Sequence, residues 1–201
     1  MFINQKYTKN GFRSLVAGLA MALSFQNANA QSSVAIQLAS ATNVDFTFDT
    51  FEKLRTGIFI ANAITFNIEA TGTRWDLYMG AVTTTPGLWD NVQLYGTSGT
   101  APTVDMIKLR VHNLSSTPLI SGFVPLQDIA TSTLDIIGNH NATDVDINCS
   151  DINPAGTNTA GSYTTDPQCY QFRVDLRIVP GTAYTPGLYT LQIEFVIAPD
   201  L

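Results

Sequence analysis

Oxygen-bearing side chains stand at alternate positions of the stretch from Asp144 to Asp151, which reads DVDINCSD. Such a run is typical of calcium loops, because Ca²⁺ takes carboxylate and carbonyl oxygens as ligands. An EF-hand loop starting at Asp144 requires Gly at its sixth position and Glu at its twelfth, where Cys149 and Ala155 stand. We interpret the stretch as a short strand that carries Cys149 on its inner face, and we predict no metal site. An irregular calcium site stays the alternative.

The chain contains two cysteines, Cys149 and Cys169. In an exported chain, two cysteines most simply form one disulfide. A bridge between them closes a loop of about twenty residues, and loop-closure entropy predicts a stabilisation of roughly 3 kcal/mol. Metal binding by the pair is less well supported, because no further Cys or nearby His completes a ligand set.

Residues for catalysis are scarce. The two histidines are His112, on the polar side of a predicted strand, and His140, in a Gly- and Asn-rich loop. No serine lies in a nucleophile-elbow motif, no zinc-binding histidine pattern occurs, and no Gly-rich phosphate loop precedes a helix. We therefore predict a protein that is not an enzyme, with no catalytic residues and no cofactor. A pair of carboxylates for glycoside hydrolysis is a minor alternative.

Two aromatic residues, Trp89 and Tyr95, occur in the longest turn-rich segment, Thr83 to Thr103. Aromatic side chains on a loop of a β scaffold can stack on sugar rings or anchor a protein partner. They are the predicted binding residues. The competing interpretation, which we favour for Trp89, is that this side chain folds back and closes one end of the core.

The N-terminus and the charge indicate an exported protein. Residues 1–30 read as a cleaved signal peptide: a basic start, the apolar run LVAGLAMALSF and the ending NANA. No later stretch is apolar enough to predict a membrane span. The remaining residues 31–201 have seven Lys and Arg against sixteen Asp and Glu, a net charge of −9. This acidity argues against nucleic acid or an anionic membrane as a partner. The expected location is the periplasm, the cell surface or the medium.

The periodicity of the chain predicts an all-β fold. Apolar and polar residues alternate over Tyr170–Ile178 and Tyr189–Ile197, as in half-buried strands. Further strands are predicted at 34–38, 44–48, 64–70, 75–81, 106–112 and 134–137. Only 49–57 suits a helical turn, with Asp49 as the N-cap. Seven to nine such strands predict a single antiparallel β-sandwich domain over residues 31–201, Ig-like or jelly-roll-like.

The C-terminal stretch YTPGLYTLQIEFVIA resembles the closing strand of exported bacterial sandwich proteins, the pilin-like fibre subunits and the spore-coat-U-like domains. Pro186, Gly187 and Tyr189 match their turn, whereas the late cysteines depart from the pilin pattern. The resemblance implies a structural or adhesive surface protein, with self-association or a protein partner. The alternative is a carbohydrate- or ligand-binding module that uses the loop 83–103. Residues 31–41 are expected to form the first strand of their own domain; in a fibre subunit they would complete a neighbour's sheet.

Overall fold

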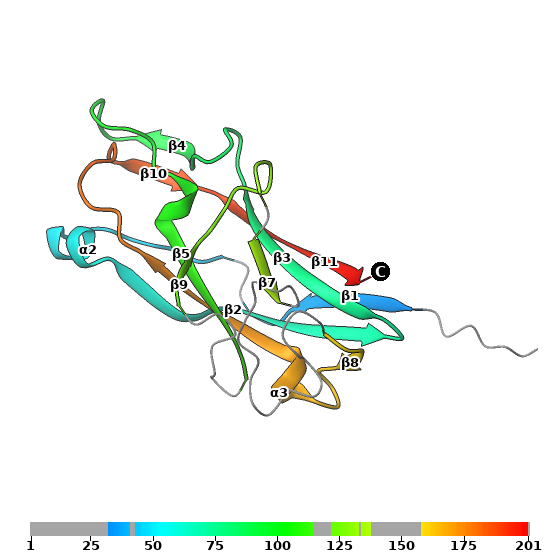
Figure 1. The fold of residues 1–201 in the computed structure, drawn as a ribbon. Coiled ribbons are helices and arrows are strands. Elements are labelled where there is room, and N and C mark those ends of the chain that lie inside the picture. The colour runs from blue at the N-terminus through cyan, green and yellow to red at the C-terminus, as the bar shows by residue number, and fades with distance from the viewer. Residues whose placement is uncertain (1–31, 41–42, 115–121, 133, 138–157, 201) are drawn as a thin grey trace, which may run out of the picture. The chain divides into compact units, whose positions relative to one another are not determined.

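Antiparallel sheets make up most of this protein. The computed structural model describes residues 32–40, 43–114, 122–132, 134–137 and 158–200. Ser32–Leu201 form one compact unit. Every pairing between its named strands is antiparallel, the helices are short, and no sheet of the described residues closes into a barrel (Figure 1). The all-β expectation is confirmed at this level.

The largest sheet has six strands, and the chain crosses over within it. Its order is β1 (Ser33–Leu38), β2 (Ile58–Thr71), β9 (Gln171–Ile178), β5 (Ile107–Asn113) and β6 (Val124–Pro125), while β8 (Gly161–Ser162) also pairs with β2. β2 and β9 therefore lie side by side although about a hundred residues separate them. This non-local pairing places β9, a strand of the C-terminal third of the chain, in the centre of the sheet.

Two smaller sheets complete the described strands. The first has the order β11 (Gln192–Asp200), β3 (Arg74–Val82) and β7 (Leu134–Ile137), and the second pairs β10 (Gly187–Thr190) with β4 (Asp90–Leu94). The two strands β3 and β11 pair over nine residues, from Gln192 opposite Val82 to Asp200 opposite Arg74. β4 and β10 lie at the opposite end of this unit from α3 (Pro167–Tyr170) (Figure 1).

The hydrophobic core lies between the six-stranded and the three-stranded sheet. Alternate residues of β9 point into it, and Phe172, Val174 and Leu176 are each at most 1% exposed. Ring contacts join the two sheets: Phe66 of β2 lies 5.2 Å from Phe195 of β11, between ring centroids, and Trp75 of β3 lies 6.0 Å from Phe172. Each fully buried side chain of this size contributes about 1.5–3 kcal/mol relative to exposure.

A bulge bends β2 near its middle. Between Ile60 and Ile64 the register with β9 shifts, and Asn62 takes a φ of 52°. Asn tolerates this left-handed conformation better than most residues, because its short polar side chain can bond locally. The bulge frees the N–H group of Asn62 from the strand ladder.

Short helices connect some of the strands. The predicted helical turn is confirmed as α2 (Phe51–Thr56), but its N-cap is Thr50, whose Oγ1 accepts a 3.2 Å bond from the N–H of Lys53. The predicted cap, Asp49, was wrong by one residue. Asp49 instead forms an ion pair of 2.7 Å with Lys53, the i,i+4 pairing that a carboxylate just before a helix can make. A 3-10 turn, η1 (Val104–Met106), precedes β5.

Most predicted strands are confirmed, with shifts of one or two residues at their ends, except that β2 begins at Ile58, six residues before the predicted start. The strand predicted at 44–48 is wrong. Val44, Phe46 and Phe48 do alternate as half-buried residues with exposed ones, but the segment pairs with no strand of the described residues. The strand predicted at Tyr189–Ile197 is interrupted at Leu191 and contributes to two sheets. The stretch from Asp144 to Asp151 and His140 lie outside the described residues, as do the expected signal peptide and its cleavage site.

Candidate functional site

The loop that carries Trp89 and Tyr95 is closed at its base by backbone pairing. Leu88 and Thr103 form an isolated antiparallel bridge, and the N–H of Trp89 donates to the carbonyl oxygen of Pro102 at 2.9 Å. The N–H of Val104 donates to the carbonyl oxygen of Gly87 at the same distance. These bonds hold both ends of the loop against the start of η1, so its aromatic residues have fixed positions.

A buried carboxylate fixes the same base from the other side. Asp128 is 3% exposed, and its Oδ2 accepts bonds from the hydroxyl of Thr83 at 2.6 Å and from the N–H of Gly87 at 3.0 Å. Its Oδ1 accepts a bond from the N–H of Ala130 at 2.9 Å. The bonds from Thr83, Gly87 and Ala130 hold the pKa of Asp128 below its usual value despite the opposing effect of burial. Sequence patterning did not single out this residue.

Trp89 is half-buried, and its side chain contacts both the hydrophobic core and a cavity. Its ring packs against the hydrophobic core, and its Nε1 donates to the carbonyl oxygen of Thr103 at 3.0 Å. This packing and this hydrogen bond hold the indole against the core. Its other surface lines a cavity, so the binding interpretation also has a geometric basis.

Tyr95 lies beside the turn that precedes β10. Its side chain is 66% exposed, and its N–H donates to the carbonyl oxygen of Pro186 at 2.8 Å. The next residue, Gly187, allows this close approach, because a Cβ there would lie 2.7 Å from the carbonyl oxygen of Gln93. The Pro-Gly pair thus serves to bring the two chain segments together.

Trp89 and Tyr95 line one cavity of about 540 Å³. A volume of this size is typical of small-ligand sites. The other aromatic side chains in its wall come from the segment before α2, from the connection between β9 and β10, and from β10 itself: Phe46, Phe48, Tyr184 and Tyr189. The structure therefore brings together the two residues that the sequence named and adds four aromatic residues that it did not.

Two polar groups, the hydroxyl of Tyr189 and the carboxylate of Asp49, belong to residues that line this cavity. The hydroxyl of Tyr189 donates to the carbonyl oxygen of Thr185 at 2.8 Å, which fixes the orientation of its ring. The carboxylate of Asp49 also lines the cavity, and the bond from Lys53 lowers its pKa. An ionised acceptor beside aromatic rings is a suitable arrangement for a ligand that has both hydroxyl groups and an apolar face.

A second cavity of about 420 Å³ shares Phe46 and Trp89 with the first. Its remaining wall is mostly apolar. It includes Leu38 of β1 and Leu176 of β9, both in the six-stranded sheet, and Phe195 of β11. Because Leu38 is 48% exposed, this cavity opens beside the end of β1. It extends the aromatic cavity toward the space between the two sheets.

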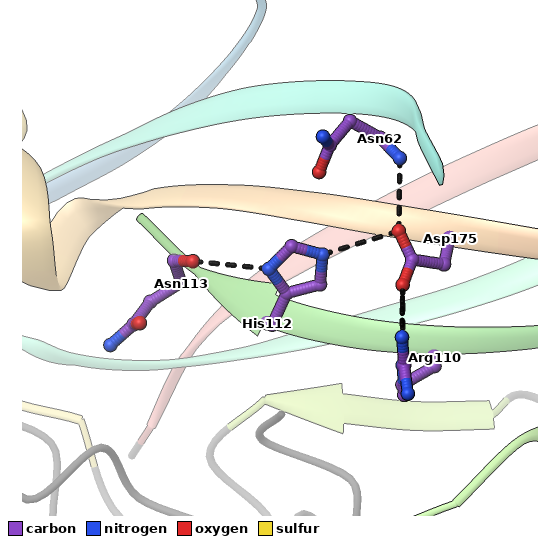
Figure 2. Close-up of polar contacts among 5 residues, drawn as sticks. All are labelled: Asn62, Arg110, His112, Asn113 and Asp175. Carbon is purple, nitrogen blue, oxygen red and sulfur yellow. Dashed lines mark hydrogen bonds and ion pairs between the residues drawn. The ribbon is translucent and has the colours of Figure 1, made fainter. Parts of the chain in front are cut away.

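A polar cluster on the six-stranded sheet is the other place where ionisable residues meet (Figure 2). Asp175 of β9 is 3% exposed and accepts bonds from the Nη2 of Arg110 at 2.7 Å and from the N–H of Asn62, in the β2 bulge, at 2.9 Å. Nε2 of His112 lies 3.3 Å from the same carboxylate. Burial alone would raise the pKa of Asp175, but the bonds from Asn62, Arg110 and His112 outweigh it and lower that pKa.

The geometry of this cluster suits a structural role. His112 is 7% exposed, and Figure 2 shows its Nδ1 facing the backbone oxygen of Asn113, at 3.2 Å, while Nε2 faces Asp175. Acyl transfer by a His–Asp pair requires a hydroxyl or thiol on the free nitrogen of the imidazole. Within the described part of the chain, neither nitrogen of His112 contacts such a group. The cluster ties β2, β5 and β9 together.

The predictions on the disulfide, a metal site and a membrane span can be compared with the described residues only. Cys169 is buried, and the described residues include no free cysteine; its expected partner Cys149 lies outside them, so the disulfide stays a prediction. No group of three or more metal-binding side chains occurs among the residues that the structure describes. In the same residues, no helix has the length and apolarity that crossing a bilayer requires.

Comparison with known proteins gives no match. No protein-family model matches the chain, and a search of the curated proteins finds no match. The function is therefore argued from the cavities and surfaces of the chain itself.

Proposed function

We propose that the protein is an exported, non-enzymatic adhesive module with a β-sandwich fold, and that it binds a carbohydrate in the cavity lined by Trp89 and Tyr95. The observation that carries this proposal is the shared cavity, in which six aromatic side chains surround about 540 Å³. Pyranose rings have an apolar face that stacks on aromatic rings, while their hydroxyl groups require acceptors such as Asp49. The cavity provides both.

The sandwich part of the proposal rests on the contacts between sheets. Phe66, Trp75 and Phe172 join the six-stranded and three-stranded sheets through one core. Two facing antiparallel sheets with polar outer faces are the arrangement of secreted recognition domains, whose loops at one end bind the ligand. The signal-peptide pattern of residues 1–30 supports the export part of the proposal.

A glycan array tests the proposal directly. We expect the wild-type protein to bind neutral oligosaccharides. Stacking of a nucleic-acid base on an aromatic ring contributes on the order of 1–3 kcal/mol. By analogy for a sugar ring, we expect Trp89→Ala and Tyr95→Ala each to weaken binding at least about fivefold. Phe51→Ala is the matched control, because Phe51 is an aromatic residue 70% exposed that does not line the cavity. Equal losses in all three variants, or no glycan bound by the wild type, would reject the proposal.

A fibre subunit is the second candidate function. The observation in its favour is that β11 is an edge strand among the described strands and lies beside the apolar cavity of Leu38 and Phe195. Against it, β1 pairs with β2 of its own chain over six residues, from Ser33 opposite Thr71 to Leu38 opposite Phe66. Self-pairing is the arrangement expected of an ordinary first strand.

Deleting residues 31–41 separates the two functions. A self-contained domain loses a strand and becomes less stable as a monomer. A fibre subunit instead stops polymerising, and the deleted segment added back as a peptide stabilises it. A monomeric full-length protein with a reversible melt and no effect of the peptide would exclude the fibre function.

A further inference from the structure

The basic residues of this acidic chain are concentrated on one sheet face. Residues 32–201 contain seven Lys and Arg, and four of them lie on β5 and β9: Lys108, Arg110, Arg173 and Arg177. Their neighbours in sequence, such as Leu109, Val174 and Leu176, are buried in the core. Because side chains alternate along a strand, the four basic residues lie on the opposite, outer face of the sheet. We call these four residues the basic strip.

The strand register places like charges beside each other. Lys108 stands directly opposite Arg177. Like charges in directly opposed positions destabilise a sheet. An arrangement of this kind in a chain with a net charge of −6 indicates that the strip has a use other than folding.

One carboxylate, that of Asp175, lies among the residues of the basic strip, and it is already bound. Nη2 of Arg110 lies 2.7 Å from Oδ2 of Asp175, and Nε2 of His112 lies 3.3 Å from its Oδ1 (Figure 2). Within the described residues, Lys108, Arg173 and Arg177 form no ion pair. The bond from Arg110 to Asp175 shows how this face binds a carboxylate, and the cationic groups on either side of it are available to bind further ones.

We propose that the basic strip binds an anionic polysaccharide that carries carboxylate groups, at a site separate from the aromatic cavity. Sheet neighbours β2 and β6 cover the edges of the β9–β5 pair, so a partner binds through the side chains of this face and not by adding a strand. Lys108 and Arg177 are both exposed, which makes their charged groups accessible to such a chain.

Phe59 supplies an apolar surface at one end of the strip. It stands opposite Arg177 in the register, is 52% exposed, and is held by an edge contact of 6.0 Å with Phe123, over which Arg110 also stacks. A pyranose ring can stack on such a side chain while its carboxylate binds Arg177. This pairing of ring and charge favours an acidic sugar over other anions.

Two other partners suit the basic strip less well. A second copy of this chain carries a net charge of −6, and the mutual repulsion of two such copies opposes association. Single-stranded nucleic acid is bound by several aromatic side chains interleaved with basic ones, whereas the strip has one exposed ring beside it. Both partners are distinguished by the experiment below.

The experiment measures binding of the mature protein to polygalacturonate, with methyl-esterified polygalacturonate as the neutral control ligand. We expect binding to the acid form that weakens with added salt, because exposed charges are screened, and no binding to the ester. The double variant Lys108→Glu with Arg177→Glu should lose binding at least tenfold. Its matched control is Lys53→Glu with Arg55→Glu, which changes the net charge equally but lies on α2; this control should bind within about threefold of the wild type.

The single variant Lys108→Glu shows whether a loss of binding is caused by a loss of stability. It places an acidic residue opposite Arg177, so its melting temperature should be equal to or higher than that of the wild type while binding falls. Trp89→Ala should leave polygalacturonate binding unchanged, which separates this site from the cavity of the proposed function. Equal binding of the ester, equal losses in both double variants, tighter binding of single-stranded DNA, or a strip-dependent self-association in its place would each overturn the proposal.

Discussion

The buried carboxylate of Asp175 is predicted to be the most important single ionic group for stability. In Asp175→Ala, the guanidinium of Arg110, the imidazole of His112 and the N–H of Asn62 lose their common acceptor. Removing one member of a buried ion pair destabilises a protein by about 3–5 kcal/mol. Because the side chain of Arg110 is 33% exposed and water can solvate it, we expect the lower end, about 3 kcal/mol.

Urea unfolding followed by circular dichroism measures this change. With an m-value of about 2 kcal/mol per molar urea, the midpoint should fall by about 1.5 M. Asp175→Asn keeps an oxygen for the N–H of Asn62 and should lose about half as much. Glu194→Ala, an exposed acidic residue of β11, is the control and should change stability by less than about 0.5 kcal/mol. A midpoint shift below about 0.5 M for Asp175→Ala would refute the reasoning.

The pH dependence follows from the direction of the Asp175 pKa. A carboxyl group whose pKa is lowered on folding stabilises the protein fully above its unfolded pKa, near 3.8, and this contribution disappears as the pH falls through the lower folded value. The stability difference between wild type and Asp175→Ala should therefore be at its full size at about pH 5 and shrink below about pH 4. An unchanged difference in strong acid would show that packing, and not charge, explains the loss.

The other predictions concern the loop and the cysteines. Asp128→Ala should lower the free energy of unfolding by about 2–3 kcal/mol, measured by urea unfolding, because three donors lose their buried acceptor; a change below about 1 kcal/mol would contradict this. Trp89→Ala should lower it by about 1–2 kcal/mol, as suits a half-buried ring, and a loss of 4 kcal/mol or more would assign the residue to the core alone. Cys149→Ser should lower Tm by removing about 3 kcal/mol, and two free thiols in denatured native protein would show that no bridge forms.

The strands that sequence alone predicted best are those with one buried and one polar face. β9 is the clearest case, because its alternation continues through Phe172, Val174 and Leu176. β4 was missed, since Asp90–Leu94 is mostly polar and acquires its partner β10 only through a pairing across ninety-odd residues. The segment 44–48 alternates equally well but pairs with none of the strands that the structure describes. Periodicity reports which side chains are buried; it does not report which backbone groups are paired.

For the candidate sites too, the sequence indicates some residues but not their neighbours in the fold. Trp89 and Tyr95 could be chosen by residue type, but only the fold shows that they share a wall with Tyr184 and Tyr189. Alternation placed Asp175 on a solvent face, because a polar position looks the same whether it contacts water or a charged neighbour. A signal was present: Arg173 and Arg177 lie two residues to either side, so Asp175 is the one acidic residue in a basic strand.

A fluorescence titration tests the carbohydrate cavity most directly. The chain has two tryptophans, and Trp75 is fully buried, so Trp89 is the indole that a bound sugar can contact. We predict that a neutral oligosaccharide selected by glycan array produces a saturable change in tryptophan emission, and that Trp89→Phe abolishes the change while Phe51→Ala retains it. Binding that leaves the emission of the wild type unaltered, or a change that persists in Trp89→Phe, would contradict the proposed site.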